Sequence, residues 1–575
     1  MNGKSPNVQG LGLSTKVCSL SIAIASLCAA SFVPSNALAF EIEGTGDVKM
    51  RWDNTLKYTA AWRMNNPDGA VANQNGAQPN VDFGDMAFKK GMINNRVDLL
   101  SEFDLAYQNL GARISGAAWY DAEYNKNHND FVGAPPNTIA AAMGGPNNLI
   151  PKAAKNIMGQ RAEIADAFVY GKFDIEDKTL SLRVGKHSLI YGESLFLGNN
   201  GIAAAQGPVD AVKLLSLPNV QFKEVAMPVG QVSGNFSISP DVSIGAYFQY
   251  QWKENRIPAA GSYFGVADFV GAGSDVLLTP PPFGTAASRS PDSKGSDSGQ
   301  WGMQVKFKVG DVDYGLYAAR YDDKNPIAVL NLGSILAGAG TLGGGTYNLM
   351  YAKDIKVYGA SFSTVFGETN VAGEISTRRN VPLVVPGDLI LNSAVANADN
   401  NRNTPYARGN SLHLNLSAIA LFSGNGLWGG ASLTGEYAYN RLLDVTYRPA
   451  YAVGLAPDPL NSTHTRDASA IRVVFQPEFF QVMPGVDIQM PIGLGYGLSG
   501  RSAVVQLSPE HGGDFSIGAN ATIDRTWKTG LNYTHFFGEK GTAPSSAVGA
   551  VSTYAAYKQY YADRDFISFT VQRTF

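Results

Sequence analysis

The sequence has little cysteine and little charge. Its two cysteines, Cys18 and Cys28, both lie within the first 39 residues. Without that segment the chain can form no disulfide bond and no thiolate metal site. Charged residues make up 16% of the chain, whereas soluble domains average about 25%. The formal net charge of -3 is close to neutral, which argues against nucleic acid as a partner.

Long apolar runs are missing beyond the N-terminus. After residue 39 no apolar run reaches about 18 residues, so the sequence predicts no membrane-spanning helix. The N-terminus itself has Lys4 and Lys16, then the apolar stretch 17–33, then Ala37-Leu38-Ala39 with its small-x-small spacing. These features are typical of a secretory signal. We therefore predict a cleaved signal peptide at residues 1–39, with an uncleaved anchor as the alternative.

Catalytic and metal-binding signatures are also missing. The six histidines include no close pair with metal-ligand spacing, and no G-x-S-x-G nucleophile elbow occurs. Residues 495–500 match the letters of a dinucleotide loop, but they end an alternating segment instead of joining a strand to a helix. The loop that begins at Asp399 lacks the glycine and the final glutamate of a calcium loop. The sequence therefore predicts no enzyme, no cofactor and no metal.

What the sequence does have is alternation with a period of two, which is typical of strands with two different faces. Trp52 and Trp62 lie ten residues apart on one apolar face, and Trp527 and Phe537 repeat the spacing. On a strand tilted by about 40°, ten residues span about 25 Å, the height of the apolar band of an outer-membrane barrel. We therefore expect the apolar faces to meet lipid and the polar faces to line an interior.

Three sets of residues follow from this alternation. The side chains predicted to face the interior are Arg51, Asp53, Lys57, Glu102, Asp104 and Lys306. The side chains predicted to form aromatic belts at the membrane interfaces are Trp52, Trp62, Trp252, Trp301, Trp527 and Phe537. The predicted C-terminal signal for the barrel assembly machinery is Phe569, Val571 and the terminal Phe575.

The connections between strands also alternate. Eight short turns, the first at Asn109 and the last at Asp524-Arg525, separate nine long loops. Short turns on one side and long loops on the other are typical of outer-membrane barrels. In lipid every backbone polar group must be paired, so only a closed ring of strands is stable. We predict an all-β fold, a transmembrane antiparallel barrel of about 18 strands (16–18), over residues 40–575.

The long connection near residues 192–228 is unusual because it mixes both signs of charge with apolar residues. We interpret it as a segment folded into the lumen that narrows the pore. An ordinary structured outer loop is the alternative. The predicted constriction residues in and beside it are Arg183, His187, Glu193, Asp210, Lys213, Lys223 and Glu224.

Three outer loops are unusually apolar, at residues 266–283, 327–342 and 381–395. The outer loops of a general porin should be polar and solvated. Apolar loops could gather an apolar solute, or they could pack on one another to form a cap.

The chain resembles the domain of unknown function 1302 family of Gram-negative outer-membrane proteins. The resemblance is carried by five stretches: 47–55, Ala167-Phe168-Val169-Tyr170-Gly171-Lys172-Phe173, Gly192-Glu193-Ser194, Pro208-Val209-Asp210, and Pro484-Gly485-Val486-Asp487 with Pro491-Ile492-Gly493. The sequence departs from the family pattern at Lys186-His187, at Tyr191 and at Gly207. The resemblance implies a barrel that moves hydrophobic compounds across the envelope, together with periplasmic and inner-membrane partners. It supplies no catalytic residue.

These observations leave several hypotheses open. The leading one is a passive outer-membrane channel for amphipathic or hydrophobic small molecules, exported by a cleaved signal and surrounded by outer-membrane lipids. A porin for small polar solutes is the runner-up, and a plugged barrel with a structural or envelope-assembly role is a third. An enzyme that acts on lipid would need a nucleophile and a base at the outer rim, and nothing in the sequence places them there.

Overall fold

The computed structural model describes residues 40–43, 47–76, 78–131, 137–217, 219–279, 286–331, 343–392, 397–449, 460, 463–544 and 554–575. The predicted signal peptide and both cysteines lie outside the described residues. Among the described residues, no helix is long and apolar enough to cross a membrane.

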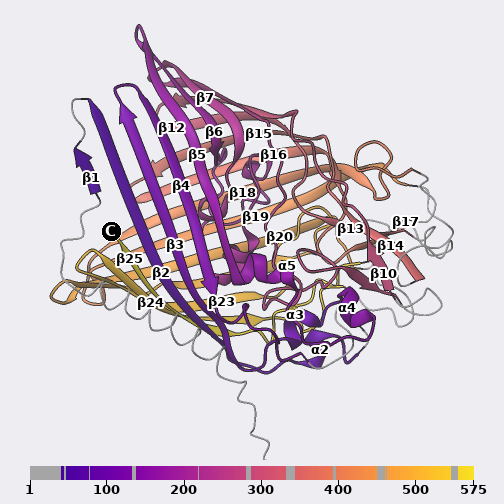
Figure 1. Ribbon diagram of the computed structural model, residues 1–575. Helices are drawn as coiled ribbons and strands as arrows, with labels where there is room; N and C mark the ends of the chain where they lie inside the picture. Colours follow the sequence, from indigo (N-terminus) through magenta and orange to yellow (C-terminus); the bar gives the residue numbers. More distant parts are fainter. Residues whose placement is uncertain are drawn as a thin grey trace, which may run out of the picture.

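The wall is a closed ring of eighteen antiparallel strands, which confirms the predicted fold and strand number (Figure 1). The ring closes where β25 pairs with β2, from Thr55 opposite Thr574 to Arg63 opposite Phe566. In chain order the strands are β2 (Val48–Arg63), β3 (Gly91–Tyr107), β4 (Leu110–Asp121), β5 (Gln160–Ile175), β6 (Lys178–His187), β7 (Val229–Ser239), β8 (Val242–Gln249), β11 (Gln300–Val309), β12 (Val312–Tyr321), β15 (Ile355–Phe366), β16 (Thr369–Pro382), β18 (Arg408–Ser423), β19 (Gly430–Tyr447), β20 (Asp467–Met483), β21 (Val486–Gln489) continued by β22 (Ile492–Ser499), β23 (Gly513–Ile523), β24 (Trp527–Phe537) and β25 (Phe566–Thr574). A short β1 (Phe40–Glu43) pairs with the start of β2, beyond the end of β25.

The two faces of the wall differ as the alternation predicts. The outward face exposes large apolar side chains, among them Trp52, Ile114 and Leu316. The inward face carries ion pairs: Arg51 lies 2.6 Å from Asp53, and Arg113 contacts the predicted interior residues Glu102 and Asp104. Since large apolar side chains are stable at a surface only in contact with hydrocarbon or another apolar face, the outward face of this closed wall is the lipid-contacting one.

The short turns and the long loops lie at opposite ends of the barrel, as predicted (Figure 1). The long-loop end carries the short helices α2 (Gly69–Ala72), α3 (Phe83–Met86), α4 (Ile139–Ala142) and α5 (Lys152–Ala154). A π-helical turn, Lys155–Gly159, then leads into β5. Packed apolar side chains stabilise this end; for example, Phe83 is fully buried and its ring meets that of Phe131 edge-on, with centroids 5.3 Å apart.

The three apolar loops contribute strands to a second sheet of five strands, which we call the cap sheet; its other two strands follow the first and the second of these loops in the chain. Its strands are β9 (Val276–Leu278), β10 (Ala286–Arg289), β13 (Ile327–Asn331), β14 (Gly343–Met350) and β17 (Leu389–Asn392), in the order β17-β13-β14-β10-β9. Leu277, Leu330 and Leu349 are each about 1% exposed within it. The apolar character of these loops thus serves packing between them, which agrees with the cap interpretation.

Trp252 does not belong to an aromatic belt, so that prediction is wrong. Its side chain is only 8% exposed and packs in the core of the cap sheet, edge-on to Tyr351 at 4.8 Å between ring centroids. The alternation continues through residue 252, but β8 ends at Gln249, so the chain has already left the wall. Trp52 and Trp301, in contrast, are exposed on the outward face, while Trp62, Trp527 and Phe537 are partly exposed.

Candidate functional site

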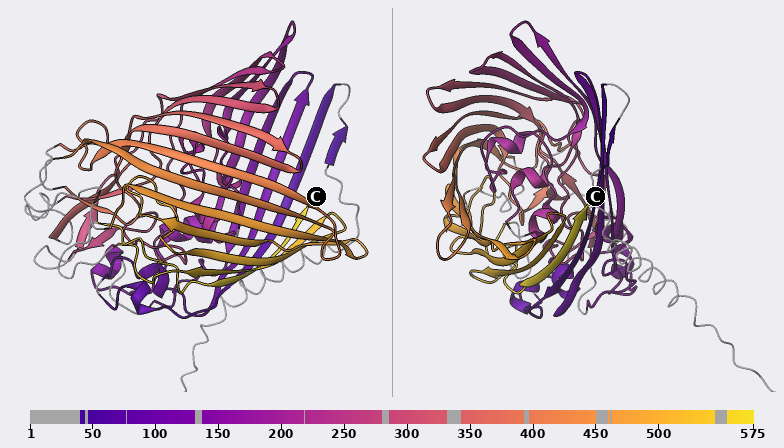
Figure 2. Two further views of the ribbon diagram at one scale, coloured as in Figure 1. Left: turned by 180° about the vertical axis from the view of Figure 1, so that it is seen from behind. Right: turned by 90° about the vertical axis from the view of Figure 1, so that its left-hand side faces the viewer.

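The connection between β6 and β7, residues 188–228, lies inside the ring of strands (Figure 2, right). We call it the inward segment. It contains a 3-10 turn at Ile202–Ala205 and the helices α6 (Ala211–Ser216) and α7 (Phe222–Val225). Counting from β2, β6 is the fifth wall strand and β19 is the thirteenth. The contacts with β19 described below therefore join strands that are eight positions apart in a ring of eighteen, almost opposite each other.

Two buried glutamates of the wall hold the inward segment. Glu374 on β16 accepts hydrogen bonds from the Glu193 amide at 2.6 Å, the Ser194 hydroxyl at 2.7 Å and the Ile202 amide at 2.9 Å. Glu436 on β19 accepts from two more amides, those of Phe196 and Leu197. Each carboxylate therefore satisfies backbone donors of irregular chain that would otherwise be buried without partners.

Asn200 lies at the centre of this attachment. Its side-chain amide donates to Asn415 Oδ1 at 2.9 Å, and its Oδ1 lies 3.0 Å from His413 Nδ1. Arg378 on β16 donates to the carbonyl oxygens of Asn199 and Gly201, each at 2.8 Å. Sequence reasoning did not identify these anchors. The only available signal was an acid or an amide at an inward position of a strand, which does not reveal its partner.

The predicted constriction residues do not form one ring of charge. Glu193 does meet the predicted interior residue Lys306, with 3.4 Å between Oε1 and Nζ. Asp210 caps α6 and lies 2.7 Å from Arg256, which in turn contacts Glu163 at 2.7 Å. Arg256 and Glu163 were not predicted, because Arg256 lies within a long loop whose path the sequence does not fix.

The other predicted residues have local roles or point elsewhere. Lys213 Nζ donates to the Glu224 carbonyl at 2.8 Å, and Glu224 Oε1 accepts from the Gln221 amide at 3.1 Å. Lys223 is exposed. On β6, Arg183 is exposed with its guanidinium 5.7 Å from the centre of the Phe168 ring, and the buried His187 places Nε2 2.8 Å from Ser233 Oγ.

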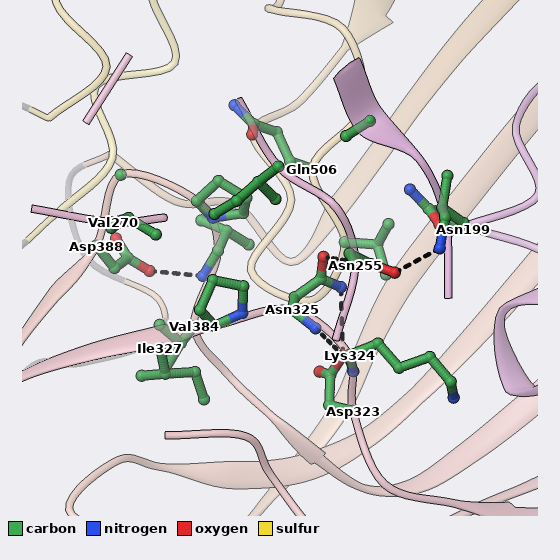
Figure 3. A pocket seen from close by; sticks show the side chains of 18 of the residues that line it. Asn199, Asn255, Val270, Asp323, Lys324, Asn325, Ile327, Val384, Asp388 and Gln506 are labelled. Atoms are coloured by element: carbon green, nitrogen blue, oxygen red, sulfur yellow. Dashed lines mark hydrogen bonds between the residues drawn. The ribbon is translucent and has the colours of Figure 1, made fainter. Parts of the chain in front are cut away.

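A cavity of about 360 Å³ lies between the inward segment, the outer loops and the wall. Apolar side chains make up most of its lining, including Leu214 of α6 and Ile327 and Val384 from two of the apolar loops. Figure 3 shows Asp388 on one side of the cavity, and Asn199 and Lys324 on the other. The volume falls in the range of about 300–1,000 Å³ that is usual for small-molecule sites.

Two ionisable side chains of the outer loops in this cavity have shifted pKa values. Burial raises the pKa of Asp388 to about 7, although its oxygens accept from the Val385 and Ala555 amides. Burial lowers the pKa of Lys324 to about 8, opposed by nearby Asp323 and Asp322. The described residues contain no cluster of His, Cys, Asp and Glu side chains that could hold a metal ion. The arrangement is that of an apolar binding cavity with a few fixed polar groups.

Comparison with known families gives one match. The family described as "Protein of unknown function (DUF1302)" matches residues 20–575. The chain belongs to this family. The match agrees with the resemblance inferred from residues such as Gly192-Glu193-Ser194, which lie in the inward segment beside Glu374. No curated protein matches the sequence.

Several solved structures are distantly similar to this DUF1302 member. One is OpdK of Pseudomonas aeruginosa with vanillate, at 10% identity and a TM-score of 0.40, covering 92% of this chain and 98% of that chain. A second is OccAB4 of Acinetobacter baumannii, at 9% identity and a TM-score of 0.37, covering 92% of this chain and 98% of that chain. A third is the outer-membrane channel DcaP of the same species, at 9% identity and a TM-score of 0.36, covering 94% of this chain and 100% of that chain. Similarity this low carries no inference about function.

Proposed function

We propose that this protein is a passive channel of a Gram-negative outer membrane that admits amphipathic or hydrophobic small molecules. The observation that carries the proposal is the largely apolar cavity between the cap loops and the inward segment. A solute from outside would first meet the outer loops, then enter this cavity and pass the inward segment to reach the polar interior.

The chemistry of the two regions supports this path. The cavity can exchange water for an apolar solute at a gain of about 25 cal/mol for each Å² of apolar surface buried. Beyond it, ion pairs such as Glu193–Lys306 and Arg113–Asp104 keep the interior wet. A small solute buries little apolar surface, so it is bound weakly enough to leave again, and weak binding is what passage requires.

The proposal also covers the membrane in which the barrel lies, its insertion there and its transport partners. The apolar outward face of the wall supports a place among outer-membrane lipids, and the terminal strand with Phe569, Val571 and Phe575 supports insertion by the barrel assembly machinery. Delivery of the solute onward would need periplasmic and inner-membrane transport partners.

One observation favours the alternative of a plugged barrel with a structural role. The inward segment is tied to the wall by carboxylates on two strands and by Asn200, and such contacts could seal the lumen. A polar solute fits the cavity less well, because it would lose its hydration against apolar side chains such as Ile327 and Val384.

Solute uptake separates these functions. Proteoliposomes that contain the purified protein should take up 4-phenylbutan-1-ol faster than empty liposomes, while glucose uptake stays near the background. Val384→Asn should slow the uptake of the alcohol, because it places an amide in the apolar lining. Val445→Asn is the matched control, since Val445 packs against the same apolar cluster without lining the cavity. Uptake of neither solute would support the plug, and equal uptake of both would support the polar porin.

A further inference from the structure

The cavity contains a buried lysine whose ammonium forms no ion pair with any of the described residues. Lys324 is 4% exposed. Its ammonium makes one long hydrogen bond, 3.4 Å to the Asp322 carbonyl, and lies 4.9 Å from the centre of the Tyr321 ring. Among the described residues it forms no ion pair. An ammonium has three donors, so two of them are left for a ligand.

A second buried cation lines the same cavity. Arg378 is 4% exposed, donates to the backbone carbonyls of Asn199 and Gly201, and lies within hydrogen-bonding reach of the Tyr321 hydroxyl. Its Nε has no hydrogen-bond partner in the described part of the chain. Tyr321 lies beside both cations, under the Lys324 ammonium and next to Arg378. The two positive side chains therefore share one region of the cavity.

Asp322 and Asp323 lie near Lys324 and partly offset its charge, but neither carboxylate forms an ion pair with its ammonium among the described residues. Asp323 Oδ1 already accepts from the Lys324 amide at 2.7 Å and from the Asn325 amide at 3.0 Å. Asp388 accepts two backbone amides on another side of the cavity, and burial raises its pKa to about 7, so it is largely uncharged in mildly acidic solution. A buried cation without a carboxylate in direct contact is costly, and an anion of the ligand would offset that cost.

The rest of the lining suits an apolar body. Figure 3 shows Val270, Val384 and Ile327 on the side of Asp388, away from Asn199. A ligand with its charged end at Lys324 could therefore place a ring or a short chain against these three side chains.

We propose that the cavity selects amphipathic anions, with a carboxylate at Lys324 and Arg378 and an apolar body against Val270, Ile327 and Val384. This inference rests on the proposed function and adds the chemical class of the preferred solute. The carboxylate would take the free ammonium donors of Lys324, which a neutral alcohol would satisfy less strongly because charge-assisted hydrogen bonds are about twice as strong as neutral ones.

Binding of three probes with one apolar body tests the proposal. Isothermal titration calorimetry at pH 7 on the full chain in lipid nanodiscs would use 4-phenylbutyrate, 4-phenylbutan-1-ol and 4-phenylbutylamine. We expect the acid to bind about tenfold more tightly than the alcohol, and the amine more weakly than either. Lys324→Met should remove the advantage of the acid and weaken the binding of the alcohol much less than that of the acid. The matched control is Lys294→Met, since Lys294 is an exposed lysine that does not line the cavity.

The wild-type comparison decides the question even if Lys324→Met fails to fold. Equal affinity for the acid and the alcohol, or tighter binding of the amine, overturns the anion preference while leaving the proposed channel for amphipathic solutes in place. Absence of binding by all three probes overturns both proposals.

Discussion

Replacing Glu374 by alanine should release the inward segment without unfolding the wall. Glu374 is 4% exposed and accepts three hydrogen bonds, from the Glu193 and Ile202 amides and the Ser194 hydroxyl. Each donor left without a partner costs about 1–3 kcal/mol, so the three together cost about 3–9 kcal/mol. Water can enter the space left by the side chain, which favours the lower end. A cost of about 3 kcal/mol changes the population of the attached segment by roughly a hundredfold.

Single-channel recording in planar bilayers measures this release. We expect Glu374→Ala to raise the mean conductance and its fluctuation, because the segment no longer stays bound to β16. Glu374→Gln should have a smaller effect, since its carbonyl oxygen still accepts. Glu368→Ala is the matched control, because Glu368 is exposed at the β15–β16 turn. Limited proteolysis should cut Glu374→Ala faster near residues 193–202. Unchanged conductance and cleavage would refute the reasoning.

Three further predictions concern the cavity and the cap. Binding of 4-phenylbutyrate should weaken as the pH rises from 7 to 9, because burial lowers the pKa of Lys324 to about 8 and the side chain loses its charge in this range. The ionisable groups that face Lys324 are Asp322, Asp323, Tyr321 and Arg378. An affinity that stays constant from pH 7 to 9 would contradict the prediction. The raised pKa of Asp388 should stabilise the folded cap as the pH falls from 7.5 to 5, because the folded state binds that proton more tightly than the unfolded chain does. Its neighbour His464, with a pKa lowered to about 4, should oppose this effect, because the unfolded chain takes up a proton at His464 in this range and the folded chain does not. Hydrogen exchange at residues 383–392 would measure this: Asp388→Asn should leave only the His464 effect and make the cap less stable at pH 5 than at pH 7.5, and a pH dependence equal to that of the wild-type protein would contradict the prediction. In single-tryptophan variants, brominated acyl chains should quench Trp301 strongly and Trp252 weakly; equal quenching would place Trp252 in the lipid.

The sequence predicts the wall well because the wall follows a local rule. Lipid outside and water inside impose alternation on each strand, so Arg51 and Asp53 can be assigned to the inward face from their spacing alone. The rule fails at Trp252, where the alternation continues past the end of β8. Periodicity describes a strand but does not show where pairing with a neighbour stops.

The candidate site is less predictable because its contacts are not local. Glu374 and Ser194 are 180 residues apart in the chain, and Asn219 and Ser516 are 297 apart. Nothing in one strand indicates which loop its inward acid will hold. The sequence does identify the charged segment near 192–228 and the apolar loops, but it does not show that they enclose a cavity together. It also gives no sign that Lys324 is buried.

The most direct test of the account is the effect of an amphipathic solute on the current through the wild-type protein. If solutes pass through the cavity, 4-phenylbutan-1-ol should cause brief, reversible and concentration-dependent reductions of single-channel current, and Val384→Asn should make them rarer. Glucose at the same concentration should cause none. A protein that shows no conductance, or one that glucose and the alcohol block equally, would contradict the account.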